Sequence, residues 1–482
     1  MKKFVICVLL MFPLMTQAQD DNTSYQEYRN NLVRDYQEFR KGILDDYADF
    51  LAGIWYEYQM FRGEKRDKTP KPLNIPNVEE IPSLPDPNVL PEPEDKHTIN
   101  PEDPFTNIPS NPSITPTPSN NPVFDFKFYD VSLRVPRMKT FKVSSLSPES
   151  VSSVWRKYQK NDNYYIIQNL NNIGNEFGLN DWFKIELVRS YANALLFDGT
   201  SSDRIVLQHF LLTNLGYDIR LAKTEKQLLL LIPFKQQVYE RSFMRIDNHK
   251  FYIFFDDISP KNDDSMSLYT CNLPKDEFKG KISDLKIKDL RFKARDDRNV
   301  TITDGIINVN VTINCGMMEM LRHYPAMEVP YYAASTVVPS IHNSILKQIK
   351  QQIAGMSNLK AANVLLHFVQ NAFIYATDHQ QHGYEKSYFI EENFYYPKND
   401  CEDRAIFYAF LIHNLLGLDV HLIEFPGHEC TAVHFNDQSV RGNGYMYKDK
   451  FYTICDPTYI GSSVGQCMPS CIYEKPIIEI WY

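Results

Sequence analysis

Residues 399–423 read NDCEDRAIFYAFLIHNLLGLDVHLI and decide the fold. Hydrophobic residues recur here every three or four positions, which predicts a buried helix that begins at Cys401. These residues are Ile406, Phe407, Phe410, Leu411 and Leu415. Asp400 is a suitable N-cap, Asp403 supplies the acid three residues later, and Gly417 is expected to end the helix.

Cys401 is the candidate nucleophile because of its place in the first turn of this helix. Unpaired backbone N–H groups and the positive end of the helix dipole favour an anion there, and they lower the pKa of a thiol. Its neighbours Glu402 and Asp403 repel a thiolate. The pKa therefore depends on whether a base lies close enough to form an ion pair.

Residues that could serve as base and orienting acid follow downstream. His428 lies in FPGHECTAVHF, after the Pro426-Gly427 turn and at the start of an expected strand. Asp456 ends a second expected strand in KDKFYTICDPTY. His434 is a rival base, but it lies six residues further along the strand on the same face, so we rank His428 first.

The ordered motifs DCEDR, PGH and CDPTY resemble the catalytic core of the transglutaminase-like superfamily, which has a papain-like fold. The resemblance covers residues 338–469. It implies an α+β core in which a helix carrying Cys401 packs on an antiparallel sheet carrying His428 and Asp456. It also implies thiolate attack on an amide carbonyl, with His428 moving protons and Asp456 fixing the tautomer of His428.

Two features of the expected site stay open. The family often has an aromatic residue directly after the histidine, whereas Glu429 and Cys430 follow His428 here, so the substrate pocket is undefined. Gln370, in the expected helix LLHFVQNAFIY, is a candidate donor to the oxyanion together with the backbone N–H of Cys401. The alternative for Gln370 is a polar edge of that helix.

The composition and charge of the chain indicate how many domains it has and which partners are disfavoured. The 482 residues are 43% hydrophobic and 13% aromatic, enough for two or three domains with large cores. The formal net charge is −9 and no basic patch is concentrated in the sequence, which argues against nucleic acid or an anionic membrane surface as the partner. No cofactor is implied by any stretch, and no calcium loop is visible.

Residues 1–18 are typical of a secretory signal peptide, with Lys2-Lys3 ahead of an apolar segment too short to span a bilayer. No later run is long enough for a membrane helix. We expect an exported protein, periplasmic or secreted.

Seven cysteines remain after Cys7 leaves with the signal peptide, and the odd number predicts at least one free thiol, assigned to Cys401. Cys467 and Cys471 could form a disulfide with each other or pair with Cys430 or Cys455. A metal site is the disfavoured rival, because paired short cysteine spacings with a matching histidine pair are missing.

The N-terminal part divides into a helical segment and a linker. Over residues 19–66, apolar residues from Tyr25 to Phe61 recur every three or four positions, which predicts one amphipathic helix or two broken near Gly53. Its aromatic stripe should pack on the body of the chain, with partner binding, active-site capping or a removable pro-segment as alternatives. Residues 67–122 are rich in proline and predict an extended linker that does not pack.

An earlier segment is similar to the candidate catalytic stretch. SSDRIVLQHFLLTNLGYDIRLA from Ser201 aligns with the sequence from Cys401, and HKFYIFFDD aligns with DKFYTICDP. Asp203, Arg204 and Asp256 thus match residues 200 positions later. Ser201 replaces the cysteine, and KTEKQLLLLIPF offers no histidine. We expect a degenerate transglutaminase-like domain over residues 123–257, a β-rich module over 258–335 and the complete domain over 336–482.

The expected function is an exported cysteine enzyme that acts on amide bonds through a thioester, with a protein, peptide or cell-wall amide as substrate. The alternative is a non-catalytic binding or assembly protein that uses the same domains as a scaffold. Substrate, acceptor and oligomeric state are not determined by the sequence.

Overall fold

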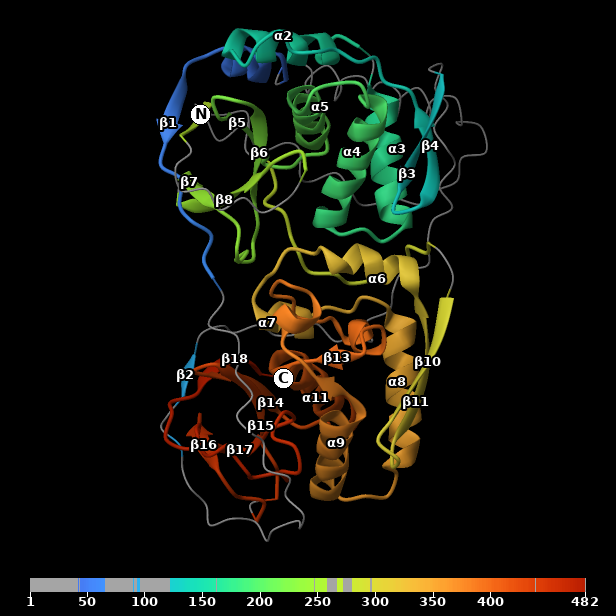
Figure 1. Ribbon diagram of the computed structural model, residues 1–482, viewed down its shortest axis with the longest axis vertical. Coiled ribbons are helices and arrows are strands. Elements are labelled where there is room, and N and C mark those ends of the chain that lie inside the picture. Colours follow the sequence, from blue (N-terminus) through green and yellow to red (C-terminus); the bar gives the residue numbers. More distant parts are fainter. Residues whose placement is uncertain are drawn as a thin grey trace, which may run out of the picture.

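The computed structural model describes residues 42, 44–65, 90, 93–95, 122–161, 163–246, 248–257, 267–271, 280–294, 297–437 and 439–481. The signal-peptide prediction and most of the linker lie outside these residues. Figure 1 shows two lobes stacked along the long axis, with the first half of the chain above and the second half below. Each lobe combines helices with an antiparallel sheet, so the fold is α+β.

The lower lobe is built around α11 (Cys401–Leu416), whose first twelve residues are all buried. Asp400 is its N-cap, and Gly417 ends it with a left-handed φ of 62°, a conformation that glycine adopts without strain. The helix packs on β14 (Val420–Phe425) and β15 (His428–Val433), which form an antiparallel pair. The predicted helix and the strand beginning at His428 are therefore confirmed.

The remaining strands of this sheet are β16 (Gly444–Tyr447), β17 (Lys450–Cys455), β18 (Ile477–Trp481) and the short β2 (Glu94–Asp95). Their order is β16-β17-β15-β14-β18-β2, and only the pair between β18 and β2 is parallel. Asp456 follows directly after β17, as predicted.

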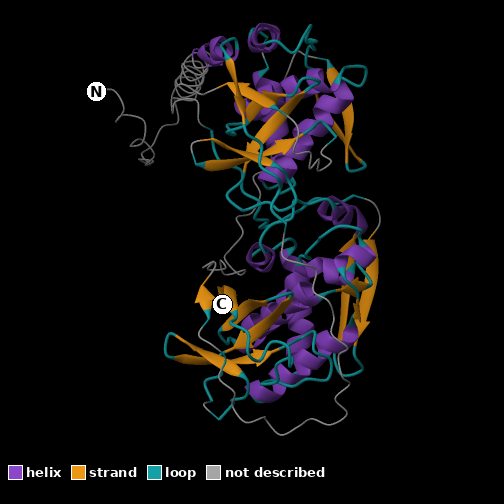
Figure 2. Ribbon diagram, turned by 60° about the vertical axis from the view of Figure 1, so that its left-hand side comes forward, coloured by secondary structure: helices purple, strands orange, loops and turns teal. Residues whose placement is uncertain are grey.

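Helices cover one face of this sheet. Next to α11 lie α9 (Asn358–Ala372) and α8 (Pro339–Gln352). Figure 2 shows the sheet of the lower lobe on the left, the helices in the middle and a hairpin on the right. Short elements complete the lobe: α6 (Cys315–Arg322), α7 (Val329–Ala333), β12 (Ile374–Tyr375), α10 (Asp378–Gln381), the 3-10 helix η2 (Ile390–Phe394) and β13 (Lys398–Asn399).

The hairpin consists of β10 (Asp297–Thr303) and β11 (Asn308–Asn314), paired in full register around a turn that contains Asp304 and Gly305. It does not belong to a separate β-rich module. Gln348 and Gln352 of α8 accept hydrogen bonds from the backbone N–H groups of Asn310 and Asn308, both at 2.9 Å. The hairpin edge is thus held by the helices of the lower lobe, and residues 315–333 after it are largely helical.

The upper lobe begins with the hairpin β3 (Val123–Phe128) and β4 (Val131–Pro136). Its helices are α2 (Pro148–Gln159), α3 (Tyr164–Glu176), α4 (Asp181–Leu195) and α5 (Ser201–Asn214). Its strands are β5 (Arg220–Lys223), β6 (Leu228–Pro233), β7 (Phe243–Ile246), β8 (His249–Phe254) and β9 (Leu268–Cys271). Asn180 caps α4 by accepting a hydrogen bond from the N–H of Phe183.

The two sheets have the same strand order. The upper sheet runs β1-β9-β5-β6-β8-β7, where β1 spans Trp55–Tyr58. Read from its other edge, the lower sheet runs β2-β18-β14-β15-β17-β16. Each strand after the helix that starts at residue 201 thus has a counterpart after the helix that starts at residue 401, which is what an internal duplication predicts.

The N-terminal segment departs from the prediction of one amphipathic helix or two broken near Gly53. Residues 44–51 are helical, and Tyr47 is 3% exposed with its hydroxyl hydrogen-bonded to His209 at 3.1 Å. The chain then becomes β1, antiparallel to β9, so the helix prediction is wrong for residues 55–58. The free edge of β9 offers backbone hydrogen bonds that an exposed helix end could not match.

The proline-rich linker also packs in one place. Leu90 is 3% exposed and its N–H donates to the carbonyl of Gly444 on β16 at 2.6 Å. Four residues later, Glu94 pairs with Ile477 at the opposite edge of the sheet. Four residues span at most about 14 Å, whereas β16 and β18 would lie about 19 Å apart in a flat sheet, so the sheet curls.

Candidate functional site

Cys401 is fully buried at the N-terminus of α11. Its Sγ–H donates to Oε2 of Glu402 at 3.2 Å, and the backbone N–H of Glu429 on β15 is directed at the sulfur. Burial raises the pKa of this thiol well above its usual range, and the nearby Glu402 and Asp400 raise it further. The surroundings of Cys401 therefore favour the thiol over the thiolate.

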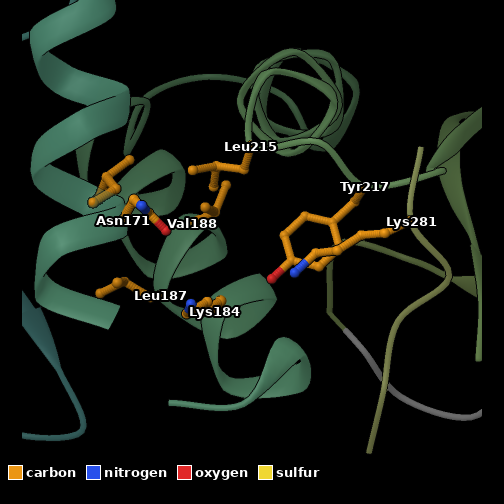
Figure 3. Close-up of a pocket in the computed structure, with 8 residues that line it drawn as sticks. Asn171, Lys184, Leu187, Val188, Leu215, Tyr217 and Lys281 are labelled. Atoms are coloured by element: carbon orange, nitrogen blue, oxygen red, sulfur yellow. The ribbon is translucent and has the colours of Figure 1, made fainter. Parts of the chain in front are cut away.

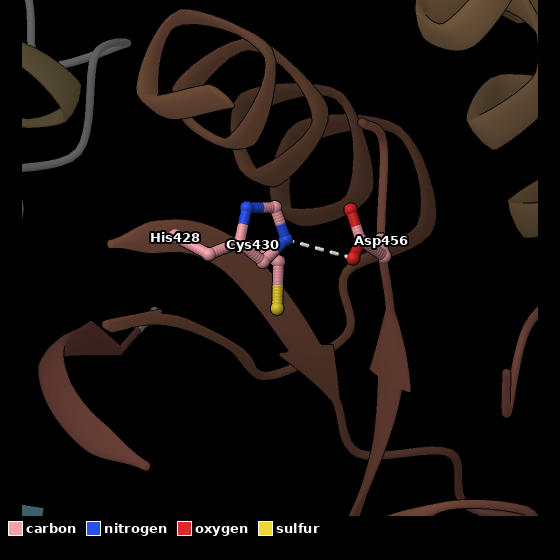
Figure 4. A group of neighbouring side chains, drawn as sticks. All are labelled: His428, Cys430 and Asp456. Carbon is pink, nitrogen blue, oxygen red and sulfur yellow. Dashed lines mark hydrogen bonds and ion pairs between the residues drawn. The ribbon is translucent and has the colours of Figure 1, made fainter. Parts of the chain in front are cut away.

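His428 and Asp456 form the expected pair. Nε2–H of His428 donates to Oδ2 of Asp456 at 2.8 Å, as Figure 4 shows. The other carboxylate oxygen, Oδ1, accepts the backbone N–H groups of Thr458 and Tyr459 at 2.9 and 3.1 Å. Burial lowers the pKa of His428, but the Asp456 carboxylate outweighs it and the net direction is upward. The acid is thus held rigidly against the imidazole.

Two of the three predicted catalytic groups are therefore brought into contact. Among the described residues, Cys401 and His428 make no hydrogen bond with each other. They lie on adjoining elements, because the N–H aimed at the Cys401 sulfur belongs to Glu429, the residue after His428. The sequence predicted the helix and the strands that carry these residues, but not the hydrogen bond between the Cys401 thiol and Glu402.

Gln370 does not have the role predicted for it. Its Nε2 donates to the carbonyls of Asp456, Tyr459 and Ser462 and to the Ser462 hydroxyl, at 2.9–3.2 Å. Its Oε1 accepts the N–H of Gly461 at 3.1 Å. With both amide hydrogens used in this way, Gln370 has none for an oxyanion. It is buried and braces the loop after Asp456, so the polar-edge alternative is wrong too.

His434 is not placed to act as the base. It lies just beyond β15, where its Nδ1–H donates to the carbonyl of Phe451 at 3.0 Å. Its ring also lies against Tyr452, with centroids 5.6 Å apart. The structure therefore gives His434 a packing role at the sheet.

In the upper lobe, the position equivalent to the His428–Asp456 pair has different side chains. Nε of Arg204 donates to Oδ2 of Asp256 at 2.6 Å, and Gln208 donates to Oδ1 at 3.0 Å. Ser201 donates to Gln227 at 3.4 Å. Asp256 thus has a permanent cation as its partner where Asp456 has an imidazole.

Three further thiols surround the His428–Asp456 pair. The sulfur of Cys430 lies within 4.8 Å of ligand atoms of both residues, and Figure 4 shows it beside the imidazole. Cys471 is hydrogen-bonded with Cys467, which together with His428 lowers the pKa of Cys471 to about 7. The seven cysteines that the structure describes are all free. The alternation of residues 428 and 430 along one strand was the signal for the Cys430 contact.

A small cavity elsewhere is too small for a substrate. It lies in the upper lobe and is lined by residues of α3 and α4 together with Leu215, Tyr217 and Lys281 (Figure 3). Its volume of about 20 Å³ leaves room for roughly one water molecule.

No protein-family model matches the chain, and no curated protein matches it either. In the described residues, no helix is both long enough and apolar enough to cross a membrane.

Proposed function

We propose that the lower lobe is an exported cysteine-dependent enzyme of the transglutaminase-like, papain-fold type, acting on amide bonds of a peptide, protein or cell-wall polymer. The observation that carries the proposal is the 2.8 Å pair between His428 and Asp456 on strands beside the helix that begins at Cys401. The matching strand orders of the two lobes support descent from one duplicated unit. Of the two copies, only the lower one has a cysteine at the helix start and a histidine at the position of His428.

The proposed reaction uses residues of this chain alone. His428 takes the proton of Cys401, and the sulfur forms a bond to the amide carbonyl carbon. The C–N bond breaks as His428 returns the proton to the leaving amine, which leaves a thioester on Cys401. Water then attacks the thioester and His428 takes the water proton. The C–S bond breaks as His428 passes that proton to the sulfur, which releases the carboxylic acid and regenerates the thiol. An amine in place of water would give acyl transfer.

A second function, a non-catalytic scaffold, is favoured by one observation. Cys401 is fully buried, and burial, Glu402 and Asp400 all raise its pKa. A thiol in that state is a poor nucleophile. For the enzyme, a change near Cys401 must bring the sulfur to His428 before the first step.

The test is alkylation of Cys401 by iodoacetamide between pH 5 and 9, located by mass spectrometry. The matched control is Ser201→Cys in a Cys401→Ser background, which places a thiol at the equivalent helix start without an imidazole. If the proposal holds, Cys401 reacts at least about tenfold faster than the control thiol near pH 7, and His428→Ala removes the advantage.

A second reagent extends the test to acyl transfer. An active ester such as p-nitrophenyl acetate should leave one acetyl group on Cys401, seen as a mass increase and absent in Cys401→Ser. Equal alkylation of Cys401 and the control thiol, together with no acetylation, would favour the scaffold.

A further inference from the structure

Three buried thiols share the small hydrophobic core beneath the curled lower sheet. They are Cys430 of β15 and Cys467 and Cys471 of the loop before β18. Cys455 lies elsewhere, because its side chain belongs to the large core that includes α11 and its Sγ–H donates to the carbonyl of Thr453 at 3.6 Å. The sequence left Cys430 and Cys455 open as partners of the other two cysteines, and the fold removes Cys455 from that set.

Cys467 and Cys471 form a hydrogen-bonded pair. The thiol of Cys467 donates to the sulfur of Cys471. The chain between them folds as a tight turn, in which the N–H of Cys471 donates to the carbonyl of Met468 at 2.9 Å. Oγ of Ser470 lies 3.6 Å from Sγ of Cys471. Cys430 affects the pair by its charge, without a hydrogen bond, so Cys467 is the partner that the geometry selects.

Cys471 has the surroundings of a reactive thiol. The hydrogen bond from Cys467 lowers the pKa of Cys471 to about 7 against the effect of burial, and His428 lowers it as well. The same hydrogen bond raises the pKa of Cys467, so Cys471 carries the negative charge of the pair. The turn lies at the surface, since Ser470 is exposed and Tyr473 is 84% exposed. A thiol with a pKa near the ambient pH is an efficient nucleophile toward disulfides.

The pair also lies beside the candidate site. Burial lowers the pKa of His428, whereas Asp456, Cys471 and Glu402 raise it, in that order. Of these three anions, Cys471 alone loses its charge when it is oxidised to a disulfide. Oxidation therefore takes a negative charge away from the imidazole.

We propose that Cys467 and Cys471 are a redox site that forms a reversible disulfide, and that this bond removes the negative charge of Cys471 from beside His428. The structure shows the pair in its reduced form. Export, as proposed above, would bring the pair into an oxidising compartment. The disulfide is independent of the proposed catalysis, since it does not involve Cys401 and would form equally in a scaffold protein.

The oxidant in this proposal is a small disulfide, RSSR. The Cys471 thiolate attacks one of its sulfurs, the S–S bond of the oxidant breaks, and RS⁻ leaves. Cys467 then attacks the Cys471 sulfur of this mixed disulfide, and the second RS⁻ leaves. The protons that the two cysteines give up pass to the two leaving groups. Two protein thiols and RSSR thus become one protein disulfide and two RSH.

The experiment equilibrates the full-length protein near pH 7.5 with mixtures of reduced and oxidised glutathione. Acid stops the exchange, free thiols are blocked with N-ethylmaleimide in denaturant, and a non-reducing digest is analysed by mass spectrometry. We expect the segment with Cys467 and Cys471 to be lighter by two hydrogen atoms and unlabelled at both sulfurs, while Cys455 is labelled. Cys467→Ser and Cys471→Ser should each abolish the cross-link.

Cys430→Ser and Cys401→Ser are the controls, and both should leave the cross-link intact. Cys401→Ser also separates this site from the proposed catalysis. In the reduced parent, iodoacetamide should label Cys471 at least about tenfold faster than Cys455 near pH 7. A cross-link from Cys471 to Cys430, or no cross-link in excess oxidised glutathione, would overturn the proposal, and the parent protein alone is enough to decide this.

The effect on His428 has its own readout, the titration of its imidazole signal by NMR, assigned by its loss in His428→Gln. We expect oxidation to lower the pKa of His428. The reduced Cys471→Ser protein should show the same lower value, because both proteins lack the anion. Equal pKa values in the reduced and the oxidised parent would refute the charge effect.

Discussion

Asp256 and Asp456 occupy equivalent positions in the two lobes, but Asp256 pairs with an arginine and Asp456 pairs with a histidine. A guanidinium group does not give up its proton in proteins, so the ion pair between Arg204 and Asp256 cannot transfer protons. The imidazole of His428 can give up and regain a proton while Asp456 orients it. The upper lobe therefore has a structural ion pair at this position, whereas the lower lobe has a pair that is able to transfer protons.

Glu402 next to Cys401 can be tested alone. Burial, then Glu402, raises the pKa of the thiol. We expect Glu402→Gln to lower that pKa, so that iodoacetamide labels Cys401 at least about tenfold faster at pH 8 in EDTA. Glu474→Gln, an exposed change, should have no effect. Equal rates in parent and Glu402→Gln would show that burial alone governs the thiol.

Gln370 gives a second prediction at this scale. Gln370→Leu leaves the buried carbonyls of Asp456 and Ser462 without their donor, and we expect a loss of about 3 kcal/mol in unfolding free energy. Gln348→Leu is the matched control, because water can replace its bonds to Asn310 at the exposed hairpin; the loss there should stay below about 1 kcal/mol. Urea denaturation measures both, and similar losses would contradict the bracing role.

At the scale of elements, the sequence was most informative where local signals agreed. For α11, an N-cap, helical spacing and a terminal glycine all pointed to the same boundaries. For β1, the spacing of Ile54, Tyr58 and Phe61 satisfied a helix equally well. What decided the outcome was the unpaired edge of β9, more than 200 residues away, which no local pattern encodes.

The candidate site, too, could be predicted only where local sequence signals exist. His428 was found because it begins a strand after a turn, and Asp456 because it directly follows a strand. The Gln370 bonds and the position of Asp378 beside Asp403 depend on loops that fold back from distant positions. Residue spacing contains no signal for such contacts.

Leu90 tests the packing of the linker. Its side chain joins the core beneath the curled sheet with Phe425 and Ile478. We expect Leu90→Ala to lower the unfolding free energy by roughly 2–4 kcal/mol, measured by urea denaturation. Ile54→Ala removes a side chain that is 73% exposed and should change it by less than about 0.5 kcal/mol. A loss for Leu90→Ala as small as that would show that the contact is not part of the folded core.

At the scale of the whole molecule, three carboxylates beside the start of α11 set a pH dependence, because burial, followed by the charge of Glu402, raises their pKa values. Unfolded carboxyl groups titrate near pH 4, whereas the folded pKa values of Asp378, Asp400 and Asp403 are raised. Above pH 4 the folded state therefore holds more protons than the unfolded state, and stability falls as pH rises. In EDTA we expect a lower unfolding free energy at pH 8 than at pH 5.

The check is urea denaturation at both pH values for the parent and for Asp400→Asn. The variant should show a smaller fall because one of the three groups no longer titrates. An equal fall in both proteins would assign the pH dependence to other groups, of which His428 is one, since its pKa is also raised.

The placing of β1 and β2 at the outer edges of the two sheets bears on how the chain is made. Trp55 pairs with Cys271, 216 residues later, and Glu94 pairs with Ile477, 383 residues later. A ribosome releases both edge strands long before their partners exist. Contacts between such distant positions form slowly, and the lower sheet in particular is completed only when residues 477–481 have been synthesised. A nascent chain interrupted before Ile477 would leave one edge of β14, and Glu94–Asp95, without their partner β18 and open to other chains.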